Sequence, residues 1–376
     1  MTSAFNIKNW MIETALPFWS TTGFDSRNGV FFERMGEDAL PDYTAPMRVR
    51  VQFRQIYTLS HAAVLGWLPG GGALALNAWN SIAHLFYKPD GAPGFVHILS
   101  PDGTILDARR DSYDHAFAIL ALAWLARATG DRQIFALVDE VLAFVDTRLT
   151  DPRGALYEGN PRALPRRQNP QMHWFEAMLA LHVAIDRPDA LMRAARFRTF
   201  FEDVLFDPAT ATLGEYFAED WSRLPDATGD SVEPGHQAEW TWLLRTHERL
   251  AGLPSGHHAS RLLDTALASA DPASGLLVDE VDRMMRVRRG TRRSWLQTEL
   301  CKAWIAECEA GRPGARAAAI SALDVLHERH LCQPFHAGWI DMLDEQLAPV
   351  SGPVPASILY HVFVAAVEAD RVLGQI

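Results

Sequence analysis

The feature that most constrains the fold of this chain is a helical period that recurs along nearly its whole length. Apolar residues return every three or four positions in about twelve segments, which is the spacing of one face of an α-helix. The expected helices are residues 5–19, 47–67, 73–87, 111–129, 132–149, 170–185, 188–205, 234–251, 257–270, 293–310, 313–330 and 355–373. Extended pieces are short, such as a hairpin expected at 95–106, so the sequence predicts an all-α fold.

Two kinds of helix alternate along the chain. Residues 113–125 are apolar nearly all round, as in a buried helix, whereas residues 188–205 and 313–330 carry arginine and aspartate on one face. Six pairs of one inner and one outer helix describe an (α/α)6 barrel of six helical hairpins, with short β-hairpins and long loops at the active-site mouth. No serine- or glycine-rich linker divides the chain, so we expect a single catalytic domain over residues 1–376.

Composition excludes several classes of protein. The 376 residues are 48% hydrophobic and 22% charged, as in a globular protein with a full core, and the net charge of −11 argues against nucleic-acid binding. The N-terminus has no basic segment followed by an apolar run, and the longest apolar stretch, near 116–126, is too short to span a membrane. The three cysteines match neither a disulfide scaffold nor a zinc motif. We therefore expect a cytoplasmic protein without a membrane partner.

The most informative stretch is Ser-Val-Glu-Pro-Gly-His-Gln-Ala-Glu-Trp, residues 231–240. Pro234 suits the first position of a helix, and Ser231 or Glu233 is expected either to cap that end or to favour its dipole. His236 then lies in the first turn, with Glu239 three residues later on the same face. The helix dipole disfavours an imidazolium and Glu239 favours it, which predicts a histidine poised near neutrality. The alternative interpretation is a surface or capping histidine.

Similar polar residues recur near the starts of the other inner helices. They are Arg50, Arg54, Gln55, Tyr57, Asp111, Tyr113, Asp114, His115, Asn169, His173, Glu176, Trp295, Gln297, Glu299, Ser357, Tyr360 and His361. In a barrel these helix ends converge on one mouth, so the pattern predicts a pocket for a polar small molecule. Each residue also has a structural interpretation: the arginines as ion-pair partners, the tryptophans as core, and His115 as a satisfied buried histidine.

Six sequence motifs, in the same order along the chain, resemble those of the N-acylglucosamine 2-epimerase family. They are RVQFRQIY (50–57), YDHAF (113–117), NPQMHWFEA (169–177), EPGHQAEW (233–240), WLQTE (295–299) and PASILYH (355–361). The resemblance covers nearly the whole chain and implies an (α/α)6 barrel. It also implies that His236 and His361 are catalytic. It further implies that Arg54, Asn169, His173 and Glu239 are substrate-binding or histidine-orienting. Four more residues near the helix starts are expected to bind the substrate: Tyr113, Trp295, Gln297 and Glu299.

The form Gly-His-x-x-Glu-Trp is similar to the mannose isomerase branch of this family. It implies interconversion of D-mannose and D-fructose through a cis-enediolate, with a small sugar as the partner. His361 would move the proton between C2 and C1, His236 would serve the oxygens, Glu239 would orient His236, and Arg54 would stabilise developing charge. A 2-epimerase of the N-acylglucosamine or cellobiose type needs the same histidines, so the outcome stays open.

No metal or cofactor is expected. The sequence lacks a His-x-x-x-His motif with a third ligand, a dense carboxylate cluster and a glycine-rich nucleotide fingerprint. A glycoside hydrolase of the same barrel would need two carboxylates, for which Asp111 with Glu239 or Glu176 with Glu299 are available. That role would leave the histidines unused. A non-catalytic sugar-binding protein is the remaining alternative.

A run of arginines between residues 283 and 293 is the one feature that favours an anionic sugar. Such runs are usually solvated, but arginine pairs well with a sulfonate or phosphate, as in sulfoquinovose. The sequence does not distinguish a monomer from a homodimer.

Overall fold

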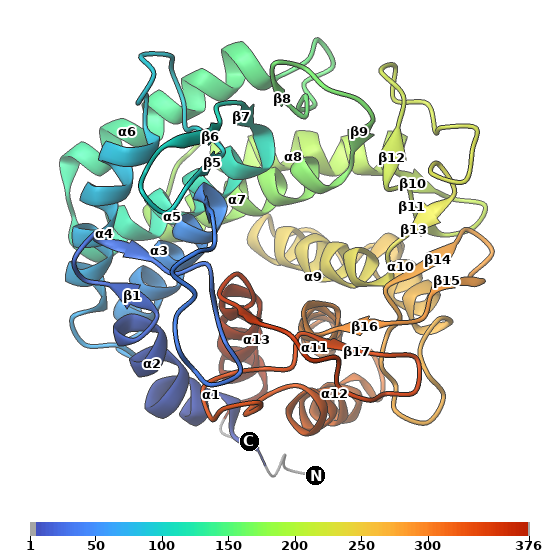
Figure 1. Ribbon diagram of the computed structural model, residues 1–376. Helices are drawn as coiled ribbons and strands as arrows, with labels where there is room; N and C mark the ends of the chain where they lie inside the picture. Colours follow the sequence, from blue (N-terminus) through green and yellow to red (C-terminus); the bar gives the residue numbers. More distant parts are fainter. Residues whose placement is uncertain (1–4, 375–376) are drawn as a thin grey trace. The chain divides into compact units, whose positions relative to one another are not determined.

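The structure is a computed structural model that describes residues 5–374 (Figure 1). The N-terminal sequence was expected not to be a signal peptide, and its first four residues, 1–4, lie outside the described residues. The chain divides into two compact units. One consists of Leu16–Phe197 and Pro355–Tyr360, and we call it the Arg54 unit. The other combines the N-terminal segment up to Ala15 with Arg198–Val354 and the segment from His361 onward, and we call it the His236 unit.

Helices account for most of the secondary structure. The α-helices are α1 (Ile7–Trp10), α2 (Leu16–Thr21), α3 (Val49–Val64), α4 (Gly71–Phe86), α5 (Ser112–Thr129), α6 (Arg132–Phe144), α7 (Asn169–Ile185), α8 (Ala190–Phe200), α9 (Pro234–Leu250), α10 (His257–Leu267), α11 (Ser294–Glu309), α12 (Ala315–Arg329) and α13 (Ile358–Leu373). Short π-helical turns are η1 (Met11–Ala15), η2 (Val145–Leu149) and η3 (Phe201–Leu205). Each expected helix is present, with ends that shift by a few residues.

The strands are two or three residues long. They are β1 (Phe24–Asp25), β2 (Val30–Phe31), β3 (Arg34–Met35), β4 (Met47–Arg48), β5 (Ile98–Leu99), β6 (Ile105–Asp107), β7 (Arg110–Asp111), β8 (Gly159–Asn160), β9 (Arg166–Arg167), β10 (Phe206–Asp207), β11 (Thr212–Leu213), β12 (Tyr216–Phe217), β13 (Ser231–Val232), β14 (Glu280–Asp282), β15 (Val287–Arg289), β16 (Arg292–Arg293), β17 (Met342–Leu343) and β18 (Val354–Pro355). Strands β5 and β6 form the hairpin expected at 95–106. The antiparallel sheet β13-β14-β15 and the pair β16-β17 frame the starts of α9 and α11.

Each unit packs its helices as inner and outer partners. In the Arg54 unit, α5 lies between α3 and α7, while α4 packs on α3 and α6 packs on α5 (Figure 1). In the His236 unit, α9 packs on α11, and α10 and α12 cover them in turn. Residues 114–126 of α5 are all buried, whereas α6 buries only one stripe of side chains. The two kinds of helix seen in the sequence are therefore the buried and the half-exposed helices of each unit.

Helix α5 shows how the sequence sets its limits. The Asp111 side chain accepts hydrogen bonds from the backbone N–H groups of Tyr113 (2.9 Å) and Asp114 (3.4 Å). Gly130 ends the helix with a left-handed φ of 68°, a conformation that glycine adopts without a steric penalty. The carboxylate of Asp111 is thus used in capping, which is a structural role for a residue considered above as a hydrolase acid.

Buried glutamines fasten the loops to the inner helices. Each lies close to the start of its helix and hydrogen-bonds the backbone of a residue in a preceding loop or strand. The pairs are Gln52 with Phe31, Gln171 with Leu156, Gln237 with Leu213 and Gln297 with Leu277. Because an amide both donates and accepts, one side chain satisfies two backbone groups where both bonds form, as at Gln297. The repeated contact holds the loops in fixed positions above the helix starts.

Two helix starts differ from expectation. Helix α13 begins at Ile358, three residues after Pro355, because Pro355 is the end of strand β18. Glu233 is the backbone N-cap of α9, but its side chain makes no capping hydrogen bond, and the Ser231 hydroxyl bonds Glu280 at 2.9 Å instead. Of the two expected roles, the side-chain cap is therefore wrong, whereas Glu233 does place its carboxyl group at the N-terminal end of the helix dipole. Glu233 is turned toward the histidine described below.

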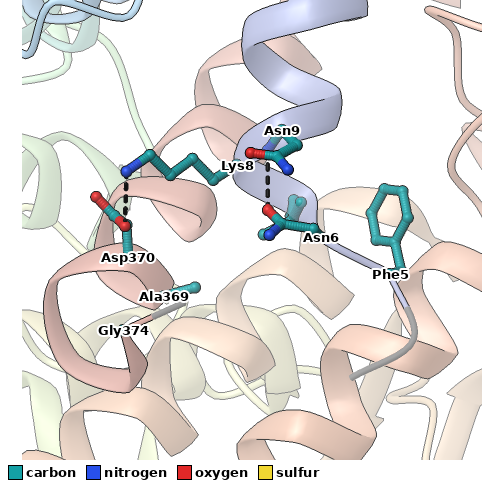
Figure 2. Close-up of a pocket in the computed structure, with 8 residues that line it drawn as sticks. Phe5, Asn6, Lys8, Asn9, Ala369, Asp370 and Gly374 are labelled. Atoms are coloured by element: carbon teal, nitrogen blue, oxygen red, sulfur yellow. Dashed lines mark hydrogen bonds and ion pairs between the residues drawn. The ribbon is translucent and has the colours of Figure 1, made fainter. Parts of the chain in front are cut away.

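Among the described residues, no helix is long and apolar enough to cross a membrane. A pocket near the N-terminal end of α1 is lined by Phe5, Asn6, Lys8 and Asp370 among others (Figure 2). Lys8 Nζ and Asp370 Oδ1 form an ion pair of 2.9 Å beside it. None of the residues expected to be catalytic or substrate-binding lines this pocket, so it is separate from the candidate site.

Candidate functional site

His236 is held at the start of α9 by a carboxylate from the preceding loop. Its Nδ1 lies 3.0 Å from Oε2 of Glu215, and both side chains are buried. Glu215 Oε1 also accepts a hydrogen bond from the backbone N–H of Glu233 at 3.3 Å, which fixes the carboxylate against the helix start. A histidine whose Nδ1 bonds a carboxylate has a defined ring orientation and presents Nε2 as its other reactive nitrogen.

The charges around His236 favour its protonated form. Burial alone would lower its pKa, but Glu215, Glu233 and Glu239 outweigh burial and raise the pKa to about 9. Glu233 Oε2 is 3.9 Å from His236 Nδ1 and 3.4 Å from Nη2 of Arg293. The expectation of a histidine near neutrality is therefore replaced by an imidazolium at pH 7, because Glu215 and Glu233 add to the effect of Glu239.

His361 has a carboxylate partner of its own. Its Nδ1 lies 2.7 Å from Oε1 of Glu299, one of the residues expected at the site. The other oxygen of Glu299 lies 2.6 Å from Nζ of Lys302, one turn further along α11. All three side chains are buried. The carboxylate of Glu299 thus bridges an ammonium group and an imidazole.

Trp295 connects the two dyads. Its ring centroid is 5.1 Å from that of His236 and 5.9 Å from that of His361, with interplanar angles of 43° and 41°. The guanidinium of Arg293 lies 5.4 Å from the indole centroid, and Trp295 remains half-exposed. An accessible indole beside two histidines is suited to stack on the apolar face of a sugar.

The Arg54 unit contains a second polar cluster. The buried Arg54 donates a hydrogen bond to the hydroxyl of Tyr113 at 2.5 Å and another to the backbone oxygen of Ser357 at 3.3 Å. Its guanidinium also lies over the rings of Phe117 (4.3 Å) and Tyr360 (5.1 Å). The side chains that surround this cation are aromatic, so its charge is compensated by ring faces and oxygen acceptors.

Glu176 organises the rest of that cluster. One of its oxygens accepts a short hydrogen bond from the Tyr360 hydroxyl, and the other lies 2.9 Å from Nδ1 of His173. The His173 ring contacts Tyr113 edge-on at 4.8 Å and Phe117 at 4.7 Å. Arg54, Tyr113 and His173, which were expected at the site, are thus brought together, and Asn169 begins the same helix as His173.

Gln297 has a different environment. Its amide oxygen accepts from the N–H of Leu277 at 3.0 Å, and its amide nitrogen donates to the Leu277 carbonyl at 2.9 Å. These contacts give Gln297 a structural role in the loop above α11. Its substrate-binding role stays a prediction.

The arginine run is neutralised by neighbouring acids. Arg283 and Arg288 pair with Asp230 at 2.6 and 3.0 Å, and Arg293 pairs with Asp279 at 3.1 Å. Arg286, Arg289 and Arg292 also lie within 4 Å of carboxylates. The run is therefore a set of ion pairs on the strands β14–β16, which weakens the argument for an anionic sugar.

Two groups of residues in the His236 unit have the composition of metal ligands. Glu215, Glu233 and His236 form one, and Glu239, Glu299 and His361 form the other, each with ligand atoms within 4.8 Å of one another. In the second group Glu299 already forms an ion pair with the Lys302 ammonium, and in the first Glu233 lies near Arg293. These cations neutralise carboxylates that a metal would need, so we do not assign a metal site here.

Two residues of this site were missed in the sequence. Glu215 follows Gly214 in a stretch expected to be mostly loop, and no local pattern connects it to His236. Lys302 did carry a signal, since a lysine inside the apolar run 300–306 of a buried helix requires a partner, and Glu299 lies three residues earlier. The two dyads are therefore more complete than the sequence motifs suggested.

Comparison with known proteins identifies the fold first. A solved D-mannose isomerase superposes with a TM-score of 0.87 at 21% identity, covering 100% of both chains. This likeness confirms the predicted class, an all-α protein with an (α/α) barrel fold.

The family follows from the sequence. The chain belongs to the N-acylglucosamine 2-epimerase (GlcNAc 2-epimerase) family, whose pattern matches over residues 29–365. A mannose-6-phosphate isomerase of Rhizobium meliloti (strain 1021) is 31% identical over 382 residues, covering 98% of this chain and 97% of that protein. A D-mannose isomerase of Thermobifida fusca is 30% identical over 207 residues, half of each chain. These relatives support a sugar isomerase or epimerase, which acts on a small-molecule sugar.

Proposed function

We propose that this protein is a metal-independent aldose–ketose isomerase that interconverts D-mannose and D-fructose through a cis-enediolate. The observation that carries the proposal is the pair of dyads, His236 with Glu215 and His361 with Glu299, whose imidazoles both lie near the ring of Trp295. An isomerase of this kind needs two proton-transfer groups, one for carbon and one for oxygen.

His361 acts on carbon. In the open-chain aldose its Nε2 takes the proton from C2, and the electron pair forms the C1–C2 double bond while the carbonyl π electrons move to O1. The same nitrogen then returns the proton to C1 to give the ketose. Glu299, at 2.7 Å from Nδ1, stabilises the imidazolium that forms between these steps.

His236 acts on oxygen. Its pKa of about 9 keeps it protonated at pH 7, so it donates a proton to O1 as negative charge develops there and then takes a proton from O2. The same ring can protonate the ring oxygen when the pyranose opens. Glu215, Glu233 and Glu239 together favour the imidazolium. The carboxylate that bonds Nδ1 is Glu215, whereas Glu239 was expected to orient the ring.

The residues of the Arg54 unit are proposed as substrate-binding, as the resemblance implies. Arg54, Tyr113, His173 and Asn169 offer donors and acceptors for sugar hydroxyls, and Arg54 can stabilise negative charge on oxygen. Glu176 positions His173 and the neighbouring Tyr360 through hydrogen bonds.

A second candidate is a mannose 6-phosphate isomerase, which is favoured by the name of the Rhizobium meliloti relative. The neutral sugar is preferred because the arginine run between residues 283 and 293 is paired with acids. A 2-epimerase would use the same histidines but return the proton to the opposite face of C2, and the family name makes it the third product to test.

The test measures whether solvent deuterium enters the product during the reaction. EDTA-treated protein is incubated with D-mannose in D2O, and proton NMR should show fructose with deuterium at C1. His236→Ala and His361→Ala should abolish this product, whereas His182→Ala, at the C-terminal end of α7, should leave it unchanged. Glucose as the early product would indicate an epimerase. Turnover of mannose 6-phosphate but not mannose would select the second candidate.

A further inference from the structure

Lys302 is a buried cation whose partners belong to the site. Its side chain has no exposed surface, its Nζ lies 2.6 Å from Glu299, and it lies 3.9 Å from the centroid of the Trp242 ring. Burying an ammonium group removes its hydration, so it is stable only with a close anion or aromatic face. Glu299 is also the carboxylate that bonds His361. Lys302 is therefore linked through Glu299 to the histidine proposed to act on carbon.

We propose that Lys302 is a positioning residue for the reaction: through Glu299, its ammonium holds His361 in place and keeps the ring able to accept a proton. This inference rests on the proposed function, because it assigns His361 the role of the carbon base. Lys302 itself acts only through Glu299 and is not given a contact with the sugar.

The electrostatic reason is the balance of charge around His361. Glu239 of α9 and Glu299 of α11 each place a carboxylate oxygen within 4.8 Å of a His361 ring nitrogen, and Lys302 of α11 pairs with Glu299. Two carboxylates alone would bind a proton on His361 tightly, and a histidine that is already protonated cannot take one from C2. The ammonium offsets one of these negative charges while it leaves Glu299 bonded to Nδ1.

The His236 dyad shows the opposite arrangement. Three carboxylates act on His236, and Arg293 lies 3.4 Å from one of them, Glu233. The protein therefore provides one histidine rich in negative charge, suited to donate a proton, and one whose carboxylate is shared with a cation, suited to accept one. Lys302 is the cation that pairs directly with the carboxylate bonded to His361.

The first test does not depend on turnover. The protonation of His361 is followed by NMR in the resting protein, with His361→Asn to assign its signals. In Lys302→Met the midpoint of its titration should rise by about one unit or more, because the charge of Glu299 is no longer offset. Lys302→Arg keeps the cation and should restore the wild-type midpoint. An unchanged midpoint in folded Lys302→Met would overturn the proposal.

A double variant tests whether the effect passes through Glu299. Glu299→Gln with Lys302→Met removes both buried charges and so leaves no unpaired ion, which keeps the test available if Lys302→Met does not fold. Relative to Glu299→Gln alone, the double variant should show little further change in the His361 titration. A further change as large as the shift that Lys302→Met causes by itself would overturn the proposal.

Measurements of enzyme activity distinguish a failure of the proposed role of Lys302 from a failure of the proposed isomerase function. If mannose is a substrate, Lys302→Met should lower kcat about tenfold at pH 7 with little change in KM, and the acid limb of the kcat/KM profile should move to higher pH. If the wild type turns over none of the sugars tested, the proposed function fails while the NMR titration still decides whether Lys302 controls His361.

Discussion

Replacing Glu215 by glutamine tests the protonated state of His236 most directly. The substitution keeps the shape of the side chain and removes the charge 3.0 Å from Nδ1. The pKa of His236 rises from its ordinary value of 6.5 to about 9, against the effect of burial, and Glu215 is the largest of the raising causes. This rise of about 2.5 units corresponds to about 3 kcal/mol. Loss of Glu215 should lower the pKa by at least about one unit.

Two assays measure this shift. If His236 donates a proton, the basic limb of the kcat/KM profile lies near pH 9 in the wild type and should move toward neutrality in Glu215→Gln. Stability should follow the same titration. Because folding raises the pKa of His236, its contribution to the free energy of unfolding is fully present below pH 6.5 and is lost as pH rises through 9. The wild type should therefore exceed Glu215→Gln in stability at pH 6, and the difference should narrow above pH 9.

Glu219→Gln is a suitable control, because it removes an exposed carboxylate from the same loop. It should leave both the basic limb and the unfolding curves unchanged. The reasoning is refuted if the basic limb of Glu215→Gln coincides with that of the wild type while the variant remains folded and active. That result would mean that another group donates the proton, or that Glu233 and Glu239 alone maintain the imidazolium.

Three further predictions concern the remaining site residues and the metal. Gln297→Leu should lower the free energy of unfolding by about 1–3 kcal/mol, since it leaves both backbone groups of Leu277 unpaired, and thermal melts should show this with KM unchanged. A large rise in KM with normal stability would instead favour the substrate-binding role. Glu176→Gln should raise the KM for mannose about tenfold with a smaller effect on kcat, because it weakens the hydrogen bonds that hold His173 and Tyr360. Equal loss of kcat in Glu176→Gln would indicate a catalytic role. Dialysis against EDTA should leave kcat unchanged, and activity lost on dialysis but restored by a divalent cation would contradict the metal-independent mechanism.

The helices were predictable because their physical causes are local. Helix α5 is apolar all round and ends at Gly130, and each of these features is visible in the sequence. The exact starts were less predictable where strands intervene. Pro355 suits the first turn of a helix, but its pairing in strand β18 delays α13 to Ile358. A strand of two residues is too short to show the alternation of apolar and polar residues that predicts a strand, so the proline alone determined the predicted helix start.

The site was predictable to the extent that its residues lie on those helices. His236, His361 and Glu299 follow helix starts and were found from their motifs, and the structure brings His361 and Glu299 within 2.7 Å. Glu215 was not found, because its contact with His236 joins a loop to a helix across 21 residues and depends on how the loop folds. Gln297 lay at a promising position for substrate binding, yet its amide is engaged with Leu277. Position at a helix start is shared by catalytic and loop-fastening residues, and only the contacts distinguish them.

The same contacts place different charges around two histidines of similar local geometry. Both rings are buried, and each has Nδ1 on a carboxylate. The difference lies in the next charge: Glu233 adds a carboxylate near His236, whereas Lys302 adds an ammonium behind Glu299. In a buried site such a change of sign alters proton affinity strongly, because little water screens it. The proposed isomerisation requires an acceptor for the C2 proton and a donor for O1 at the same pH, and this difference in charge is what we propose to separate the two roles.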